Sequence, residues 1–296
     1  MGRHTDIGTE EQRSGDPARA RLLSGLPVTE RRLDLADIST PVLQGGSGPP
    51  LVLLHGPGEF AAKWLRVLPQ LVTTHRVIAP DLPGHGASEV GDANLDTERV
   101  MAWLGALLDR TCADAPVLLG HTLGGAIAAR FASRTDRPIE QLVLVDSLGL
   151  GRFRPAPRFL VTMVAFRARP TEHSYDRFMR QCSLDLDELR ERFGDRWEPF
   201  VAYNLDSATS PNAKHVGRLM REVGLPRIPD AELARISTPT ILIWGRHDRA
   251  NRPAIAEAAS ARYGWPLHVI EDCADDPPRD RPEAFLKVLY GALDRE

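Results

Sequence analysis

The chain has few cysteines and no long apolar run, and both absences narrow what it can be. Its three cysteines, Cys112, Cys182 and Cys273, are odd in number and widely spaced, which excludes a disulfide framework and a Cys-x-x-Cys zinc site. No stretch approaches the roughly 18 apolar residues of a membrane-spanning helix. The first residues are polar and lack the apolar core of a signal peptide, so we expect a flexible tail over residues 1–25 and a cytoplasmic protein.

Cofactor and charge signals are also missing. The glycine-rich turns do not follow the Gly-x-Gly-x-x-Gly spacing of dinucleotide-binding proteins, and the sequence shows no phosphate loop or metal-ligating cluster, so we expect no cofactor and no metal. The net charge of −3 and the isoelectric point near 6.3 give no reason to expect nucleic acid or a membrane as a partner. A small neutral molecule is the partner that these absences favour.

The sequence does contain an ordinary globular composition, with 42% hydrophobic and 26% charged residues among 296. Short apolar runs alternate with longer amphipathic segments, which is typical of buried parallel strands joined by crossover helices. The expected strands lie at residues 29–37, 40–44, 51–54, 77–79, 117–119, 142–145, 240–244 and 267–270. The expected helices lie near residues 61–71, 97–110, 123–134, 253–262 and 282–294. The sequence therefore predicts a three-layer α/β protein.

The alternation of strands and helices breaks over residues 147–235. This stretch is richer in charge, proline and aromatic residues, and it contains helical segments such as 174–182 and 187–193. A long insertion at the carboxyl end of a parallel strand lies where such sheets bind ligands. We therefore expect a helical cap over residues 147–235, set on a core formed by residues 26–146 and 236–296.

Five short motifs follow successive predicted strands. They are His55-Gly56-Pro57-Gly58, the segment Asp81–Ser88, the segment Gly120–Gly125, Gly245-Arg246-His247-Asp248 and the closing segment Asp272–Phe285. In this order and spacing the chain resembles the capped, single-domain α/β-hydrolases over residues 28–294. The resemblance implies a mostly parallel eight-stranded sheet flanked by helices, with the cap between the sixth and seventh strands.

Thr122 stands at the apex of the sharp turn between a predicted strand and a predicted helix, where the family usually has a nucleophilic Ser. Thr keeps the hydroxyl, but a β-branched residue is disfavoured in the strained backbone of such a turn. Three roles stay open for Thr122: a slowed nucleophile, a hydrogen-bond donor to the substrate, and a packing residue.

The acid and base positions differ in how well they fit the family. Asp248 takes the position of the acid that orients the catalytic His. Asp275 stands where the resemblance places that His, and a carboxylate serves as a base near neutral pH only if its pKa is raised, for example by proximity to Asp248. Alternatively, Asp275 and Asp276 are loop or helix N-cap residues. The other candidates for the base are the histidines His55, His85, His121, His173 and His215.

The expected oxyanion hole also departs from the family pattern. The resemblance implies one donor at the N–H of Leu123 and a second in the loop after His55-Gly56. Pro57 has no N–H, so Gly58 or Glu59 must supply the second donor. His55 and His121 are expected beside this loop as bracing or pocket residues.

These features favour an α/β-hydrolase-type enzyme that acts on a small to medium apolar carbonyl compound, such as an ester, a lactone, a thioester or a cleavable C–C bond. Its non-standard catalytic site would contain Thr122, Asp248 and Asp275, and the aromatic residues of the cap indicate an apolar pocket. Two alternatives stay open: a lyase, isomerase or cofactor-free oxygenase that uses Asp275 or Asp276 as acid or base, and an inactive ligand-binding or sensing protein. A monomer and a homodimer fit the sequence equally well.

Overall fold

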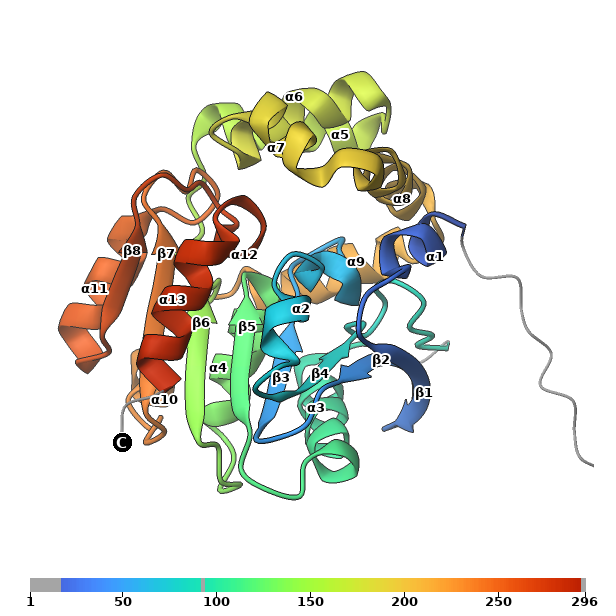
Figure 1. The fold of residues 1–296 in the computed structure, drawn as a ribbon. Coiled ribbons are helices and arrows are strands. Elements are labelled where there is room, and N and C mark those ends of the chain that lie inside the picture. The colour runs from blue at the N-terminus through green and yellow to red at the C-terminus, as the bar shows by residue number, and fades with distance from the viewer. Residues whose placement is uncertain (1–16, 92–93, 294–296) are drawn as a thin grey trace, which may run out of the picture.

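The computed structural model describes residues 17–91 and 94–293. One eight-stranded sheet runs through the molecule in the order β1-β2-β4-β3-β5-β6-β7-β8 (Figure 1). The β1–β2 and β2–β4 pairs are antiparallel and the other five are parallel, which confirms the mostly parallel sheet that the resemblance implied. The strands are β1 (Thr29–Leu35), β2 (Ile38–Gly45), β3 (Pro50–Leu54), β4 (Arg76–Pro80), β5 (Val117–His121), β6 (Gln141–Val145), β7 (Thr240–Gly245) and β8 (Leu267–Ile270).

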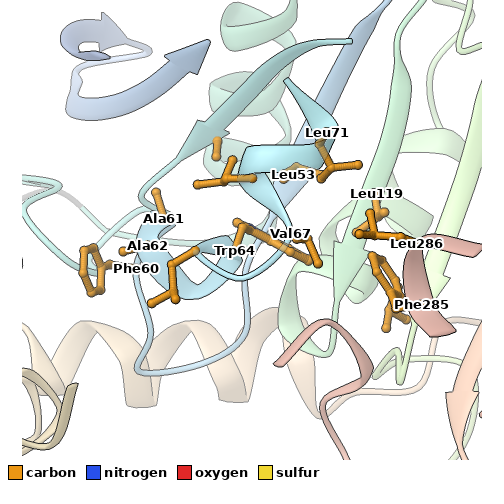
Figure 2. Packing of buried hydrophobic residues seen from close by; sticks show 14 of the residues in the cluster. Leu53, Phe60, Ala61, Ala62, Trp64, Val67, Leu71, Leu119, Phe285 and Leu286 are labelled. Carbon is orange, nitrogen blue, oxygen red and sulfur yellow. The ribbon is translucent and has the colours of Figure 1, made fainter. Parts of the chain in front are cut away.

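Alternate side chains of the central strands enter two separate hydrophobic cores. Leu51 and Leu53 of β3 belong to one cluster, and Val52 and Leu54 belong to the other. Figure 2 shows the first cluster, in which Leu53 lies with side chains of the segments that cover this face of the sheet. Those segments are η1 (Ala61–Trp64), α2 (Leu68–Leu71) and α13 (Pro282–Leu293), whereas α3 (Thr97–Thr111), α4 (Leu123–Ala132) and α11 (Pro253–Tyr263) contribute to the second cluster. The result is the expected helix–sheet–helix sandwich.

The chain between β6 and β7 forms the inserted helices. They are α5 (Pro157–Ala168), α6 (Glu172–Cys182), α7 (Leu186–Phe193), η2 (Gly194–Arg196), α8 (Trp197–Thr209), α9 (Ala213–Leu219), the π-helical turn η3 (Met220–Gly224) and α10 (Asp230–Leu233). Figure 1 shows α5 to α8 as a cap over the end of the sheet.

The last part of the predicted cap packs against the core instead. Leu219 and Val223 are fully buried in the second hydrophobic cluster, with residues of α4. Arg130 of α4 donates hydrogen bonds to the carbonyl oxygens of Val223 (3.2 Å) and Pro226 (2.6 Å). Within the stretch 147–235, therefore, it is α5 to α8 that lie above the sheet.

Helix α1 (Pro17–Leu23) lies in the part of the chain that was expected to be a flexible tail. Leu22 is fully buried, and Arg19 forms an ion pair with the buried Asp81 (2.8 Å). The expectation of a tail is therefore wrong for these residues, because apolar burial and a buried ion pair hold them on the core. Residues 1–16 of the expected tail lie outside the described residues. Within the described ranges, no helix has the length and apolar character needed to cross a membrane.

Candidate active site

The turn between β5 and α4 holds Thr122 in a strained backbone conformation. Its φ of 46° and ψ of −104° lie outside the regions that β-branched residues normally adopt. The N–H of Thr122 donates to the carbonyl oxygen of Val145 (2.9 Å), and its own carbonyl oxygen accepts from the N–H of Leu148 (3.1 Å). These bonds to the end of β6 and the residues beyond it fix Thr122 at the carboxyl edge of the sheet.

Glycines allow the close packing behind this turn. A Cβ on Gly120 would lie 2.3 Å from the carbonyl oxygen of Gly124, and one on Gly124 would lie 2.2 Å from the carbonyl oxygen of Leu54. Any larger residue at either position would push α4 away from the sheet. The glycine-rich sequence is therefore what lets the strand turn sharply into the helix and present Thr122.

Three polar side-chain atoms converge on Gly56 in the loop after β3. Measured from the position that a Cβ on Gly56 would take, Thr122 Oγ1 lies at 2.5 Å, Glu59 Oε2 at 2.7 Å and His121 Nδ1 at 3.1 Å. Thr122 Oγ1 and His121 Nδ1 are both buried, and neither has a hydrogen-bond partner among the described residues. Because buried polar atoms rarely lack a partner, this pair marks a place where a ligand or a reacting group fits.

His121 is held in one tautomer. Its Nε2 lies 2.9 Å from the backbone oxygen of Asp275, and a carbonyl oxygen can only accept, so Nε2 carries the hydrogen. In the neutral imidazole the lone pair is then on Nδ1, the nitrogen near Thr122 and Glu59. A general base needs such a lone pair within hydrogen-bond reach of the hydroxyl. In this structure Thr122 Oγ1 and His121 Nδ1 both lie near Gly56 but are not hydrogen-bonded to each other.

Glu59 places a negative charge beside these two residues. Its Oε2 accepts from the N–H of Gly56 (2.8 Å) and lies 3.7 Å from His121 Nδ1, and its Oε1 lies 3.5 Å from Lys63 Nζ. Burial opposes ionisation, but the Lys63 cation outweighs it and holds the pKa of the Glu59 carboxyl well below its usual range. The sequence analysis considered only the backbone N–H of Glu59. Glu59 lies in the loop before η1 and not on a helix, so no helical spacing marked its side chain in the sequence.

A buried charge network extends from Lys63 to α12 (Pro277–Asp280). Lys63 Nζ lies 2.6 Å from Asp276 Oδ1, and Arg279 Nη1 lies 3.2 Å from Asp276 Oδ2. Burial opposes the charge of Asp276, but Lys63 and Arg279 lower its pKa. Its carboxylate also accepts from the N–H of Arg279 (3.2 Å), so Asp276 is the N-cap of α12, which is one of the roles left open by the sequence.

Asp275 lies in the loop between β8 and α12, next to Asp276. Its carboxyl is mostly buried, and Oδ1 has no hydrogen-bond donor among the described residues, with Arg279 Nη2 at 3.5 Å. Burial raises the pKa of Asp275 to about 8; Arg279 opposes this rise, while Asp248 adds to it. The carboxyl therefore keeps its proton near neutral pH, and the group that contacts His121 is the backbone oxygen of Asp275.

Asp248 follows β7 and forms a buried pair with Asp146, a residue that the sequence analysis missed. Asp248 Oδ1 accepts from the N–H groups of Ala250 (2.7 Å) and Asn251 (2.8 Å). Burial raises the pKa of Asp248 to about 7, although these two hydrogen bonds favour the ionised form. Asp146 has a φ of 42°, accepts from the N–H of Gly245 (3.0 Å) and lies within hydrogen-bonding reach of Asp248. Because two buried carboxyls resist ionising together, the pair retains a proton. An aspartate directly after a buried strand was the available signal.

The backbone donors of the site are few. Leu123 is the first residue of α4, and its N–H donates to no acceptor in the described part of the chain. The N–H of Gly56 is taken by Glu59, and Pro57 has none. Gly58, with a φ of 79°, presents its carbonyl oxygen to Ser207 of α8 (3.3 Å). The Leu123 N–H is therefore a free donor for a developing oxyanion.

The other candidate histidines have different surroundings. His55 donates from Nδ1 to the carbonyl oxygen of Gly56 (2.7 Å) and accepts at Nε2 from the N–H of Leu82 (2.9 Å), so both nitrogens are occupied. Burial lowers its pKa and that of His85, which falls to about 3. His173 is exposed at the start of α6, and His215 packs on Gly84. Among the candidates, His121 is the histidine that lies beside Thr122.

A pocket opens between the loop after β3, α1, α8 and α12. Its apolar wall is formed by Leu22, Phe60, Ala62, Leu65, Phe193, Phe200 and Tyr203, and its polar wall by Glu59, Lys63, Asn204, Asp276 and Arg279. This lining is mainly apolar with a few polar groups, but the cavity of about 20 Å³ holds only a water-sized group in this structure, and neither Thr122 nor His121 lines it. In the described residues, no group of three or more His, Cys, Asp or Glu side chains is arranged to hold a metal ion.

The sheet order, the inserted helices and the strained strand-to-helix turn place the chain in the class of α/β-hydrolase folds. The model of the alpha/beta hydrolase family matches residues 51–288, and the chain belongs to this family.

Two relatives that cover most of this chain are named as a hydrolase and an esterase. The chain is 37% identical over 280 residues to 2-hydroxy-6-oxo-2,4-heptadienoate hydrolase of Pseudomonas putida, covering 88% of this chain and 94% of that protein. It is 28% identical over 269 residues to pimeloyl-[acyl-carrier protein] methyl ester esterase of Aeromonas hydrophila, covering 85% and 98%. The solved structure of 2-hydroxy-6-oxo-6-phenylhexa-2,4-dienoate hydrolase from Rhodococcus sp. strain RHA1 superposes with a TM-score of 0.79 at 23% identity, covering 90% and 99%, which shows the shared fold.

Proposed function

We propose that this protein hydrolyses a small, mainly apolar carbonyl compound at a non-standard catalytic site, with Thr122 as the nucleophile. The observation that carries the proposal is the convergence of the unpartnered Thr122 hydroxyl, His121 Nδ1 and the Glu59 carboxylate around Gly56. The names of two relatives, a methyl ester esterase and a hydrolase of a 2-hydroxy-6-oxo dienoate, support carbonyl compounds as the substrate class. The apolar wall of the neighbouring pocket supports an apolar substrate.

In the proposed reaction, His121 is the general base. Its Nδ1 takes the hydroxyl proton as Thr122 Oγ1 attacks the carbonyl carbon, and it returns that proton to the leaving group as the bond between this group and the carbonyl carbon breaks. The Glu59 anion, 3.7 Å from Nδ1, stabilises the imidazolium that exists between these two proton transfers. The N–H of Leu123 donates to the oxyanion. Water then hydrolyses the acyl-threonine by the same route.

The two aspartates act through other groups in this proposal. Asp275 positions His121 with its backbone oxygen, which accepts the Nε2 hydrogen. Burial, with a smaller contribution from Asp248, raises the pKa of Asp275 and keeps that carboxyl protonated, which avoids another buried negative charge near the site. The role of Asp248 in this proposal is therefore electrostatic and acts through Asp275. We expect slow turnover, because the hydroxyl is that of a Thr and the oxyanion hole is weakened: the N–H of Gly56 is taken by Glu59 and Pro57 has none. Loss of one oxyanion donor costs on the order of 100-fold in rate.

A lyase or isomerase is the second candidate, and one observation favours it. The Asp275 carboxyl holds its proton near neutral pH and has an oxygen without a hydrogen bond among the described residues. Such a carboxyl can donate a proton to a substrate oxygen or carbon. In that reaction Thr122 is a hydrogen-bond donor and no acyl-enzyme forms.

The test compares wild type with Thr122→Val, which keeps the shape and removes the hydroxyl, and with Thr122→Ser, which keeps the hydroxyl. Hydrolysis of p-nitrophenyl esters of two to eight acyl carbons is followed, and intact-mass spectrometry detects the acyl-enzyme. We expect turnover and an acyl adduct in wild type and Thr122→Ser, and neither in Thr122→Val. Ester turnover that survives Thr122→Val would overturn Thr122 as the nucleophile, and its loss in Asp275→Asn would assign the acid–base role to the Asp275 carboxyl on which the second candidate depends. Inactivity of all variants would favour a ligand-binding protein.

A further inference from the structure

Helix α5 carries an apolar stripe on its outer face. The stripe consists of Leu160, Val161, Val164, Ala165 and Ala168, which recur at the spacing of one helix face and are all exposed. Leu160, Val161 and Val164 are 43%, 62% and 54% exposed, and they are three of the four large hydrophobic residues that are exposed in the described chain. An exposed apolar set of this kind on one helix indicates a contact surface.

The opposite face of α5 already has partners in the cap. Phe159 and Phe166 are buried, and Phe166 stacks on Phe178 of α6 with ring centroids 5.8 Å apart. Phe166 also contacts Tyr175 of α6 at 5.2 Å. Figure 1 shows α5 beside α6 at the outer end of the cap. Packing within the cap thus accounts for the inner face of α5 and leaves the stripe uncovered.

The segment that contains the stripe is strongly basic. Residues 147–171 hold five arginines and no acidic residue. The arginines are Arg152, Arg154, Arg158, Arg167 and Arg169, all of them exposed. The following helix α6 holds two acidic residues: Asp176, which is paired with Arg180 and Arg190, and the exposed Glu172 in its first turn, so the local excess of positive charge remains. The net charge of −3 for the whole chain conceals this local positive excess.

We propose that the stripe and its arginines form a docking surface for an anionic lipid bilayer, to which the protein binds peripherally. An aliphatic face flanked by arginines suits such a membrane in two ways. The apolar side chains insert at the boundary between headgroups and acyl chains, and the guanidinium groups bind the anionic headgroups. This inference does not depend on the reaction proposed above.

A second copy of the chain fits this surface less well. A symmetric dimer through α5 would bring the five arginines of one protomer against the same five of the other, without an acidic residue in the segment to compensate them. The stripe also lacks the Trp and Tyr anchors that dominate most protein interfaces. Charge complementarity therefore selects an anionic surface.

The experiment is flotation of the purified full-length protein with vesicles of 30% phosphatidylglycerol and 70% phosphatidylcholine, compared with vesicles of phosphatidylcholine alone. We expect at least fivefold more bound protein on the anionic vesicles at 50 mM salt, and a marked fall at 500 mM salt. Val161→Asp/Val164→Asp and Arg158→Gln/Arg169→Gln should each lower the bound fraction at least fivefold.

Matched controls separate the stripe from general charge and polarity. Arg31→Gln/Arg110→Gln removes the same charge from exposed positions elsewhere, and Leu184→Asp places an acid at the fourth exposed apolar residue. Both should bind vesicles like wild type, and circular dichroism should show every variant folded. The proposal is overturned if anionic vesicles bind no better than neutral ones, or if Val161→Asp/Val164→Asp binds normally, which would indicate adsorption by charge alone. Concentration-dependent dimerisation that this variant abolishes, without vesicle binding, would assign the surface to a second copy.

Discussion

The Nε2 atom of His121 lies 2.9 Å from the backbone oxygen of Asp275, a residue 154 positions further along the chain. Asp275 occupies the loop in which the resemblance to the α/β-hydrolases places a catalytic His. In this protein the loop supplies the acceptor, and the imidazole comes from the residue before Thr122. The proposed base and its orienting group are therefore arranged differently from the pattern expected from the sequence, while both remain at the carboxyl edge of the sheet.

His121→Gln should lower kcat for ester hydrolysis by about 10²- to 10⁴-fold, the usual contribution of a general base, with KM little changed. A glutamine amide can still donate to the backbone oxygen of Asp275, but it cannot take a proton from Thr122. Steady-state kinetics on the best p-nitrophenyl ester measure the effect. The exposed His173→Gln is the matched control and should behave like wild type. If both variants keep full activity, His121 is not the base.

Thr122→Gly should make the protein more stable and abolish hydrolysis. Glycine tolerates the φ of 46° and ψ of −104° that strain a β-branched residue, so the free energy of unfolding should rise by about 1 kcal/mol. Urea denaturation measures it. In a regular helix a Thr→Gly substitution lowers stability, so Thr209→Gly at the end of α8 should not raise the free energy of unfolding. Loss of stability in Thr122→Gly would show that the turn stores no strain.

The sequence was sufficient to predict the fold because its signals are local. Apolar runs such as residues 51–54 are buried on both faces only in a central strand, and the glycines around Thr122 fit only a tight strand-to-helix turn. The candidate site was less accessible. The contacts of Glu59 and Asp146 depend on how separate loops meet, which no spacing in the sequence encodes.

Helix α1 illustrates the same limit at the N-terminus. Its polar composition predicted a tail, because composition does not reveal that Arg19 meets the buried Asp81 and lies 4.7 Å from the ring of Phe60. Local sequence thus determined the elements, and long-range contacts determined the roles of individual polar side chains.

Lys63→Met should destabilise the fold by about 3–5 kcal/mol. The side chains of Lys63 and Asp276 are each 2% exposed, so removal of the cation leaves the buried Asp276 carboxylate with Arg279 as its remaining partner and takes the nearby cation from Glu59. The double variant Lys63→Met/Asp276→Asn should recover part of the loss, because asparagine removes the charge and still caps α12. Urea denaturation tests both. The more exposed pair of Arg137 and Asp109 is the control, and Arg137→Met should cost less than about 1 kcal/mol. Equal losses in the two single variants would contradict a special role for burial.

The protein should become less stable as the pH rises from 7 to 8.5. The pKa of Asp275 is about 8 and that of Asp248 about 7, so the folded protein holds protons here that an unfolded chain, with carboxyls of ordinary pKa, has already released. Stability from a raised carboxyl pKa is lost as the pH rises through the folded value, by up to about 1.4 kcal/mol per pH unit for each proton. The buried neutral His55 and His85 give the opposite slope, but only below about pH 6.5, where unfolded histidines protonate.

Urea denaturation at pH 7.0, 7.5, 8.0 and 8.5 measures this slope. Asp275→Asn mimics the protonated carboxyl and should flatten the curve, because one of the protons that the folded state retains is gone. Asp114→Asn, at an exposed site, should keep the slope of wild type. If the stability of wild type is constant or rises over this range, the carboxyl of Asp275 is ionised at neutral pH, and the second candidate function loses the proton donor on which it depends.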